Sequence, residues 1–137
     1  MEPLYHPPID REQMLTFSSL ALAHMGDAVY EIMVRAELCA QHNLTNKVLH
    51  RKTVELVCAK SQAAAARHMK PVLTDAEQAV FSRARNTRPN NIPRAASPGD
   101  YSLATALEAV FGYLYLNGEN ERINELFALC KETFTEQ

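Results

Sequence analysis

Residues 101–116 read YSLATALEAVFGYLYL, and residues 20–30 read LALAHMGDAVY. Both stretches space their apolar residues with the period of a helix and do not alternate them as a strand does. The first stretch carries one charged residue, Glu108, and the second carries one acid, Asp27. The two stretches therefore predict apolar helices and, with the rest of the chain, an all-α fold.

Helical patterns continue through most of the remaining chain, which is rich in Ala, Leu, Glu, Lys and Arg. Ser18 and Ser19 are both suitable N-caps, and Thr74 opens a capping box (TDAE). Pro71 ends the helix that precedes this box, and the Asn-Gly pair at 117–118 is a C-terminal signal. We predict helices over about residues 17–40, 45–69, 74–86, 100–117 and 119–134, a long loop at 88–99 and no sheet. At 137 residues the chain is expected to form one domain, with residues 1–15 as a short N-terminal extension.

The composition indicates the compartment. Hydrophobic residues make up 47% and charged residues 22% of the chain, the balance of a soluble globular protein. Residues 1–15 lack the apolar core of a signal peptide, and no stretch is apolar and long enough to span a bilayer. Three widely spaced cysteines, Cys39, Cys58 and Cys130, are expected to be reduced and mostly buried. We therefore expect a cytoplasmic protein with no membrane partner.

Asp27 and Glu108 are expected to be at least partly buried, because each lies in an apolar helix. An unpaired buried carboxylate is costly or becomes protonated, so each requires a partner. Arg35 lies two turns from Asp27, and no arginine lies within one turn of Glu108. Convergence of both carboxylates on one hard cation, Mg²⁺ or Mn²⁺, meets both requirements. The alternative is a pair of buried acids held by backbone amides or by distant arginines.

Glycines lie beside both carboxylates: Gly26 directly precedes the aspartate, and Gly112 follows the glutamate by one turn. Interior helical glycine costs roughly 1 kcal/mol relative to alanine. Two of them indicate either a close approach of two helices or room for a phosphate. Glu31 lies one turn after the aspartate on the same face. It is either a further metal ligand or the partner of Arg35 in an i,i+4 surface pair, which we favour slightly.

The net charge of −2 conceals a basic middle segment. Residues 38–99 contain ten Lys and Arg and three Asp and Glu, a charge of +7 that leaves −9 for the rest of the chain. Such a segment suits a polyanion, and arginine forks and amides suit phosphate and sugar oxygens. Four aromatic residues, Tyr101, Phe111, Tyr113 and Tyr115, lie in the apolar helix and are expected to be in the core instead of stacking on bases, which favours duplex over single-stranded RNA. The candidate RNA-binding residues are Arg51, Lys52, Arg83, Arg85, Asn86, Arg88 and Arg94; the alternative is an Arg-rich solvated turn.

The motifs and their order resemble the ribonuclease III family. Residues 22–29 (LAHMGDAV) are similar to its signature helix, roughly L-E-F-L-G-D-A-V, and residues 107–114 (LEAVFGYL) are similar to its second motif, E-A-L-I-G-A. The match is best with the mini-ribonuclease III branch, which has the endonuclease domain alone. Its GDAVYE motif, basic RxRN loop and YxxA/STxxEAxxGYLYL helix stand here at residues 26–31, 83–86 and 101–116. The resemblance covers about residues 15–130.

The resemblance implies a dimeric, ribonuclease III-like helical bundle in which Asp27 and Glu108 hold Mg²⁺, with Mn²⁺ as a substitute. It implies a hydrolase that cuts double-stranded RNA, leaves 5′-phosphate ends and matures the 23S ribosomal RNA precursor. DNA is not an expected partner. Full-length members carry two further carboxylates at the positions of Ala23 and Thr105. Glu31, Thr105 and water are therefore expected to complete the metal shell.

Two other functions stay open. The two missing carboxylates are compatible with a catalytically inactive ribonuclease III-like domain that serves as a structural RNA-binding subunit. A helical protein-interaction domain with an incidental basic face is the second alternative. Retention of Asp27 and Glu108 in apolar surroundings favours the enzyme, because a pure binder gains nothing from them.

Overall fold

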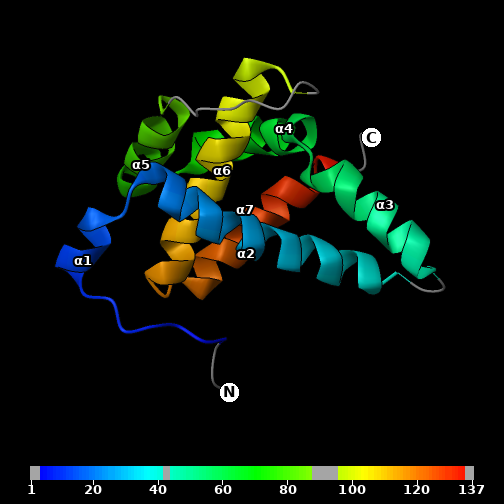
Figure 1. The fold of residues 1–137 in the computed structure, drawn as a ribbon, viewed down its shortest axis with the longest axis horizontal. Coiled ribbons are helices and arrows are strands. Elements are labelled where there is room, and N and C mark those ends of the chain that lie inside the picture. Colours follow the sequence, from blue (N-terminus) through cyan, green and yellow to red (C-terminus); the bar gives the residue numbers. More distant parts are fainter. Residues whose placement is uncertain (1–3, 42–43, 88–95, 135–137) are drawn as a thin grey trace.

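The computed structural model describes residues 4–41, 44–87 and 96–134, and within these ranges every regular element is a helix (Figure 1). In chain order these are α1 (Arg11–Thr16), α2 (Ser19–Cys39), α3 (Asn46–Val57), α4 (Ala59–Met69), a 3-10 turn (Lys70–Val72), α5 (Asp75–Arg85), α6 (Pro98–Leu116) and α7 (Asn120–Lys131). The predicted all-α class is confirmed. None of the described helices is long and apolar enough to cross a membrane.

Helix α6 forms the centre of the fold. It packs against α2, α4, α5 and α7, and its most extensive partner is α2, which crosses it (Figure 1). Leu107, Val110, Phe111 and Leu114 of α6 have no exposed surface. Because neighbouring helices cover it on several sides, α6 is apolar around most of its circumference, as expected of a buried helix.

Local sequence signals set most helix ends where they are predicted. The Ser18 hydroxyl caps α2, and Thr74 with Glu77 forms the predicted capping box at the start of α5. Gly118, just after α6, adopts a φ of 75° and closes the last turn of that helix. Glycine takes this left-handed conformation without a steric cost, which explains the sharp end of α6.

The sequence predicts one helix over residues 45–69, whereas the structure has two, so this prediction is wrong at its middle. Cys58 is extended, with φ −67° and ψ 160°, so α3 ends before it and α4 begins after it. Across the break, the Ser61 hydroxyl donates to the Glu55 carbonyl oxygen at 2.5 Å. A side chain thus replaces a backbone hydrogen bond that the break removes.

The N-terminal extension includes a short helix that is not among the helices predicted from the sequence. It contains α1, whose N-cap Asp10 accepts a hydrogen bond from the Gln13 N–H at 2.8 Å. Before α1, His6 stacks on Tyr115 of α6 with 4.3 Å between the ring centroids, and the Tyr115 hydroxyl donates to the Tyr5 carbonyl oxygen. The extension therefore packs against the C-terminal end of α6.

The three cysteines are free, and the expectation that they are mostly buried is wrong. Cys39 and Cys58 are exposed, and only Cys130 is buried. The two exposed thiols stand at the end of α2 and at the break between α3 and α4, where the chain leaves the packed core.

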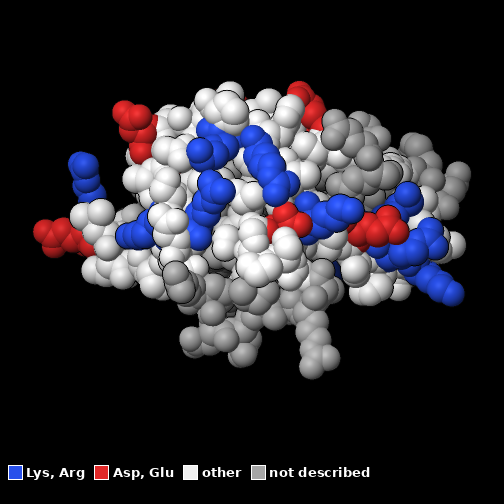
Figure 2. Space-filling view, turned by 90° about the horizontal axis from the view of Figure 1, so that it is seen from above, with Lys and Arg blue, Asp and Glu red and all other residues white. Residues whose placement is uncertain are grey.

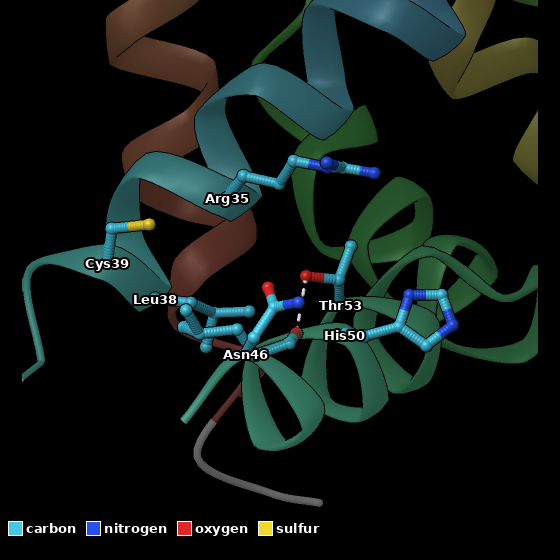
Figure 3. Close-up of a pocket in the computed structure, with 7 residues that line it drawn as sticks. Arg35, Leu38, Cys39, Asn46, His50 and Thr53 are labelled. Atoms are coloured by element: carbon cyan, nitrogen blue, oxygen red, sulfur yellow. Dashed lines mark hydrogen bonds between the residues drawn. The ribbon is translucent and has the colours of Figure 1, made fainter. Parts of the chain in front are cut away.

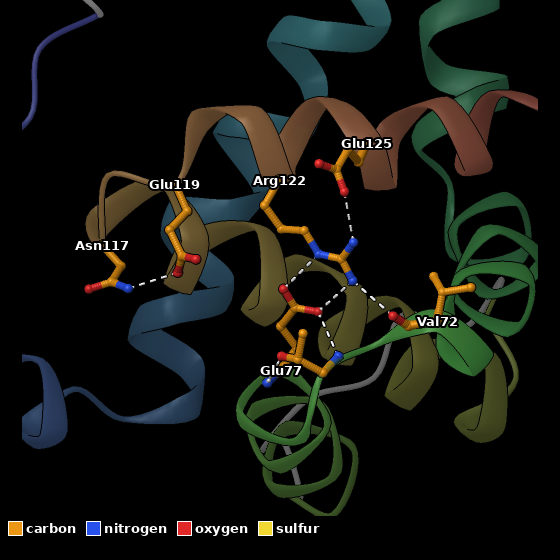
Figure 4. A network of polar contacts seen from close by, with 7 residues as sticks. Val72, Glu77, Asn117, Glu119, Arg122 and Glu125 are labelled. Carbon is orange, nitrogen blue, oxygen red and sulfur yellow. Dashed lines mark hydrogen bonds and ion pairs between the residues drawn. The ribbon is translucent and has the colours of Figure 1, made fainter.

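An ion pair with a buried carboxylate joins the start of α5 to α7 (Figure 4). Arg122 donates to both Glu77 carboxylate oxygens at 2.9 Å, to the Val72 carbonyl oxygen at 2.8 Å and to Glu125 at 3.0 Å. Burial acts to raise the pKa of Glu77, but the hydrogen bonds from Arg122 and Thr74 outweigh it and lower that pKa below 4.5. The pair holds α5, which carries two of the predicted RNA-binding arginines, against the core.

Candidate active site

The site is built where α2 crosses α6 at two glycines. A Cβ atom on Gly26 would lie 1.6 Å from the Glu108 carbonyl oxygen, and a Cβ on Gly112 would lie 1.9 Å from the Leu22 carbonyl oxygen. The two backbones therefore touch, with no room for a side chain between them. Of the two explanations for these glycines, close helix approach is confirmed. Room for a phosphate is wrong, because backbone fills the space.

The crossing brings together the two acids that the sequence singles out. Asp27 follows the glycine of α2, and Glu108 precedes the glycine of α6 by one turn. Burial, repulsion from the Asp27 carboxylate and a hydrogen bond between the two carboxyl groups raise the pKa of Glu108 to about 8. Such a pair keeps one proton unless a cation replaces it.

The two acids differ in exposure. Glu108 is half-buried, as expected, but Asp27 is exposed, and the expectation of burial is wrong for it. The covered face of α2 contains Leu22, Gly26 and Val29, and the side chain of Asp27 lies outside it. A shallow cavity of about 350 Å³ is lined by His24, Met25, Asp27, Ala28 and Glu31. The Glu108 carboxylate is thus partly enclosed by the fold, whereas the Asp27 carboxylate is accessible to a large ligand.

The donor set fits Mg²⁺ or Mn²⁺ better than zinc. In the described part of the chain, no Lys or Arg is among the groups that set the pKa of Glu108. Nor does any cluster of three or more His, Cys, Asp or Glu in residues 4–41, 44–87 and 96–134 suit a metal ion. A closed structural zinc site needs four protein ligands. Mg²⁺ is commonly held by one or two carboxylates, with waters and substrate phosphates as its other ligands.

Gln62 of α4 is a third polar residue at the site, and no sequence motif marks it. Its side chain is 2% exposed, and its contact with Glu108 acts to lower the pKa of that carboxyl. Its Nε2 atom is buried and lies toward Glu108, but it makes no hydrogen bond of normal length and angle with any described residue. The sequence offers one indication of this role: Gln62 directly precedes four alanines, whose small side chains suit close packing of helices.

Glu31 and Thr105 occupy ordinary local arrangements. Glu31 Oε2 lies 2.7 Å from Arg35 Nη2, which is the i,i+4 surface pair favoured from the sequence. The Thr105 hydroxyl is buried and donates to the Tyr101 carbonyl oxygen at 3.0 Å. Each residue lies within one helical turn of a carboxylate, and its part in a metal shell stays a prediction.

The RNA-binding candidates lie on separate elements. Arg51 and Lys52 are on α3, Arg83 and Arg85 are on α5, Asn86 is the C-cap of α5, and Arg88 and Arg94 lie outside the described residues. Arg83 also serves the fold, because its Nε donates to Ser19 Oγ at 3.2 Å and its Nη2 to the Phe17 carbonyl oxygen at 3.3 Å. Figure 2 shows Lys and Arg side chains spread across the face over α5, α4 and α3, with few acids among them.

A separate cavity of about 280 Å³ lies between the end of α2 and α3 (Figure 3). Its lining consists of Arg35, Leu38, Cys39, Asn46, Leu49, His50 and Thr53. The Thr53 hydroxyl there donates to the Leu49 carbonyl oxygen at 2.8 Å. Because the cavity includes no carboxylate and none of the predicted site residues, we assign the chemistry to the α2–α6 crossing.

Comparisons with known proteins identify the family of the chain. Residues 20–119 match the Ribonuclease III domain. The chain is similar to the Mini-ribonuclease 3 of Symbiobacterium thermophilum, 42% identical over 112 residues that cover 82% of this chain and 86% of that protein. It is 37% identical over 128 residues to the Mini-ribonuclease 3 of Thermoanaerobacter sp., which covers 93% and 90% of the two chains. A crystal structure of a protein from Fusobacterium nucleatum superposes with a TM-score of 0.77 and 28% identity, over 85% of this chain and 93% of that one. The chain therefore belongs to the ribonuclease III family.

Proposed function

We propose that this chain is a Mg²⁺-dependent endoribonuclease that hydrolyses double-stranded RNA, and that it acts in the cytoplasm as a homodimer. Membership of the ribonuclease III family supports nuclease activity on double-stranded RNA. The observation that carries the proposal is the meeting of Asp27 and Glu108 at a crossing where two helix backbones touch. In this proposal residues 1–137 form one catalytic domain.

Asp27 and Glu108 are the residues that would hold the cation, with Mn²⁺ as a substitute for Mg²⁺. Burial and the neighbouring Asp27 carboxylate raise the pKa of Glu108, and a divalent cation would stabilise the ionised form of both acids. When bound, the cation activates water for attack on a phosphodiester and stabilises charge on the leaving oxygen. Glu108 lies on the packed helix α6, which fixes its position, whereas Asp27 is exposed and accessible to the phosphates of an RNA. Glu31, Thr105 and water would complete the shell.

The basic face over α3, α4 and α5 supports duplex RNA as the substrate (Figure 2). Arg85, on the last turn of α5, is exposed and makes no hydrogen bond or ion pair with the described side chains, so its guanidinium is available to phosphate oxygens. Resemblance to the mini-ribonuclease III branch supports products with 5′-phosphate ends and the 23S ribosomal RNA precursor as the natural substrate. We do not expect DNA to be cut.

The homodimer is supported by a mainly apolar stripe on α2 (Leu20, His24, Ala28 and Ile32) that nothing in the described part of the chain covers. Leu20 is 48% exposed and Ile32 is 55% exposed, with His24 and Ala28 exposed between them at intervals of four residues. A stripe of this kind can pack against its own copy across a two-fold axis. Because His24 and Ala28 also line the cavity that holds Asp27, such a dimer would place each site beside the interface.

The test is cleavage of a long duplex RNA by purified protein in Mg²⁺, in Mn²⁺ and in EDTA. Asp27→Asn and Glu108→Gln are expected to bind the RNA without cutting it. Glu121→Gln, which changes an exposed acid at the start of α7, serves as the matched control and is expected to cut normally. Wild-type protein that binds duplex RNA with a steep salt dependence but cuts it under no condition would instead be a catalytically inactive RNA-binding subunit. Absence of salt-dependent binding would point to the protein-interaction domain.

A further inference from the structure

Gln62 is buried beside the carboxylate pair without a full set of hydrogen bonds. Its Nε2 makes no hydrogen bond of normal geometry in the described part of the chain, although the residue is only 2% exposed and its amide lies near enough to Glu108 to affect that carboxyl. A buried donor without a hydrogen-bond partner lowers the stability of the fold by about 1–3 kcal/mol, and such donors are rare in native proteins. A hydrophobic residue at this position would fill the space at lower cost.

We propose that Gln62 is a positioning residue for Glu108: its Nε2–H donates to the Glu108 carboxylate when that carboxylate turns toward the cation. This donation would leave the other carboxylate oxygen of Glu108 as the metal ligand. The inference rests on the proposed metal site at Asp27 and Glu108, and it adds a third helix, α4, to the two that cross there.

The packing of α4 places the amide where this donation is possible. Ala63, Ala65 and Ala66 directly follow Gln62 and have no exposed surface, so α4 lies close against α6 along this stretch. Small side chains allow that approach, and they leave the amide as the polar group that reaches the carboxylate of Glu108.

A neutral donor suits this role better than a charged one. A lysine or arginine at the position of Gln62 would neutralise Glu108 and compete with the cation for it. An amide offers an N–H without positive charge, so it can hold the carboxylate and leave its charge to the metal. Hydrogen bonds to metal-binding carboxylates are commonly worth 10–100-fold in metal affinity.

A structural role and a positioning role for Gln62 predict different effects on the stability of the metal-free protein. If the amide mainly supports the fold, its removal lowers the stability of the metal-free protein and leaves metal affinity unchanged. If it positions Glu108, removal of an unpaired donor leaves the metal-free protein as stable as before or more stable. Metal affinity then falls.

The experiment measures Mn²⁺ affinity by calorimetry and the melting temperature of metal-free protein for wild type, Gln62→Met, Gln62→Leu and Asp27→Asn. Gln62→Met keeps the length of the side chain and removes the donor. Thr53→Val, which removes a buried hydroxyl that is 7% exposed on α3, is the control for loss of a buried polar group. We expect Mn²⁺ affinity to fall on the order of tenfold in Gln62→Met, with kcat reduced, KM for duplex RNA unchanged and melting temperature maintained.

Each outcome decides between the possibilities. Gln62→Met or Gln62→Leu that binds Mn²⁺ as tightly as wild type, while Asp27→Asn does not, overturns the role of Gln62 and leaves the metal site in place. Variants of Gln62 that both melt well below wild type with normal Mn²⁺ affinity indicate a structural amide and also overturn it. If wild type and Asp27→Asn bind Mn²⁺ equally weakly, the proposed metal site itself is wrong.

Discussion

Replacement of Gly26 by alanine is expected to separate α2 from α6 and to reduce both stability and metal affinity. A Cβ atom on Gly26 would lie 1.6 Å from the Glu108 carbonyl oxygen, whereas ordinary van der Waals contact begins at 3.4 Å. The difference means that the two backbones must separate by about 1.8 Å along this contact. Because the obstacle is backbone, it cannot be relieved by rotation of a side chain.

The expected loss of stability is large for a single methyl group. Overpacking of a well-packed core costs about 1–3 kcal/mol and occasionally more. The extra separation also weakens dispersion contacts along the most extensive helix pair in the fold. Alanine recovers up to about 1 kcal/mol through its helix propensity. We therefore expect a net loss of about 2 kcal/mol, or about 7 °C in melting temperature for a chain of this length.

Metal affinity should fall with stability, because Asp27 moves with α2 and Glu108 moves with α6. Metal–ligand distances tolerate deviations of only about 0.2 Å. The assay is thermal and urea unfolding together with Mn²⁺ calorimetry on wild type, Gly26→Ala and Gly99→Ala. A Cβ on Gly99, in the first turn of α6, has nothing within 4 Å, so this control should be unchanged or more stable by about 0.5–1 kcal/mol. If Gly26→Ala melts and binds Mn²⁺ as wild type does, the two backbones do not touch and the argument is refuted.

Four further results are expected. Arg122→Leu should lower the free energy of unfolding in urea by about 3 kcal/mol, because the buried Glu77 carboxylate loses its partner. The pKa of Glu77 is lower in the folded than in the unfolded protein, so its ion pair with Arg122 stabilises the fold fully above pH 4.5. This stabilisation is lost as the pH falls through the pKa of Glu77 in the folded protein, and the difference in unfolding free energy between Arg122→Leu and wild type should shrink in that range. Arg85→Gln should weaken duplex RNA binding and reduce the slope of log affinity against log salt by about 0.9, and an unchanged slope would exclude a phosphate contact. Glu31→Gln should reduce Mn²⁺ affinity and turnover if Glu31 completes the shell; if neither changes, Glu31 is only a surface partner. In metal-free protein, Glu108→Gln should raise the melting temperature at pH values above 8. The raised pKa of Glu108 means that its ionisation destabilises the fold as the pH rises from 4.5 to about 8, and glutamine does not ionise. A lower melting temperature of the variant above pH 8 would contradict the raised pKa.

The predictable parts of this protein depend on local sequence. Ser18, Thr74 and Gly118 determine helix ends within their own turns, so the starts of α2 and α5 and the end of α6 follow from the sequence. Asp27 and Glu108 stand out because each is the sole acid in an apolar stretch, and that contrast requires no knowledge of the fold.

The missed features depend on which surfaces meet in three dimensions. The break at Cys58 has no glycine or proline to mark it, and it is stabilised by the hydroxyl of Ser61 bonding to a carbonyl oxygen six residues earlier. The exposure of Asp27 depends on how much of α2 is covered by its neighbours. Gln62 becomes part of the site only because α4 packs against α6, which no periodicity in either helix reveals.

Close contact between the glycines of α2 and α6 explains how the carboxyl groups of Asp27 and Glu108 stay together in the metal-free fold. Below a pH of about 8 the pair shares one proton. Above that pH, repulsion between the two carboxylates favours separation of the helices, but it acts within one turn of each. Apolar packing acts along the whole crossing: Tyr30 of α2 and Phe111 of α6 are fully buried and meet edge to face with 5.4 Å between ring centroids. Because the packing is spread over many residues and the repulsion is local, the fold holds the two carboxylates together. A cation therefore meets ligands that are already in place, and its binding energy is not consumed by assembling them.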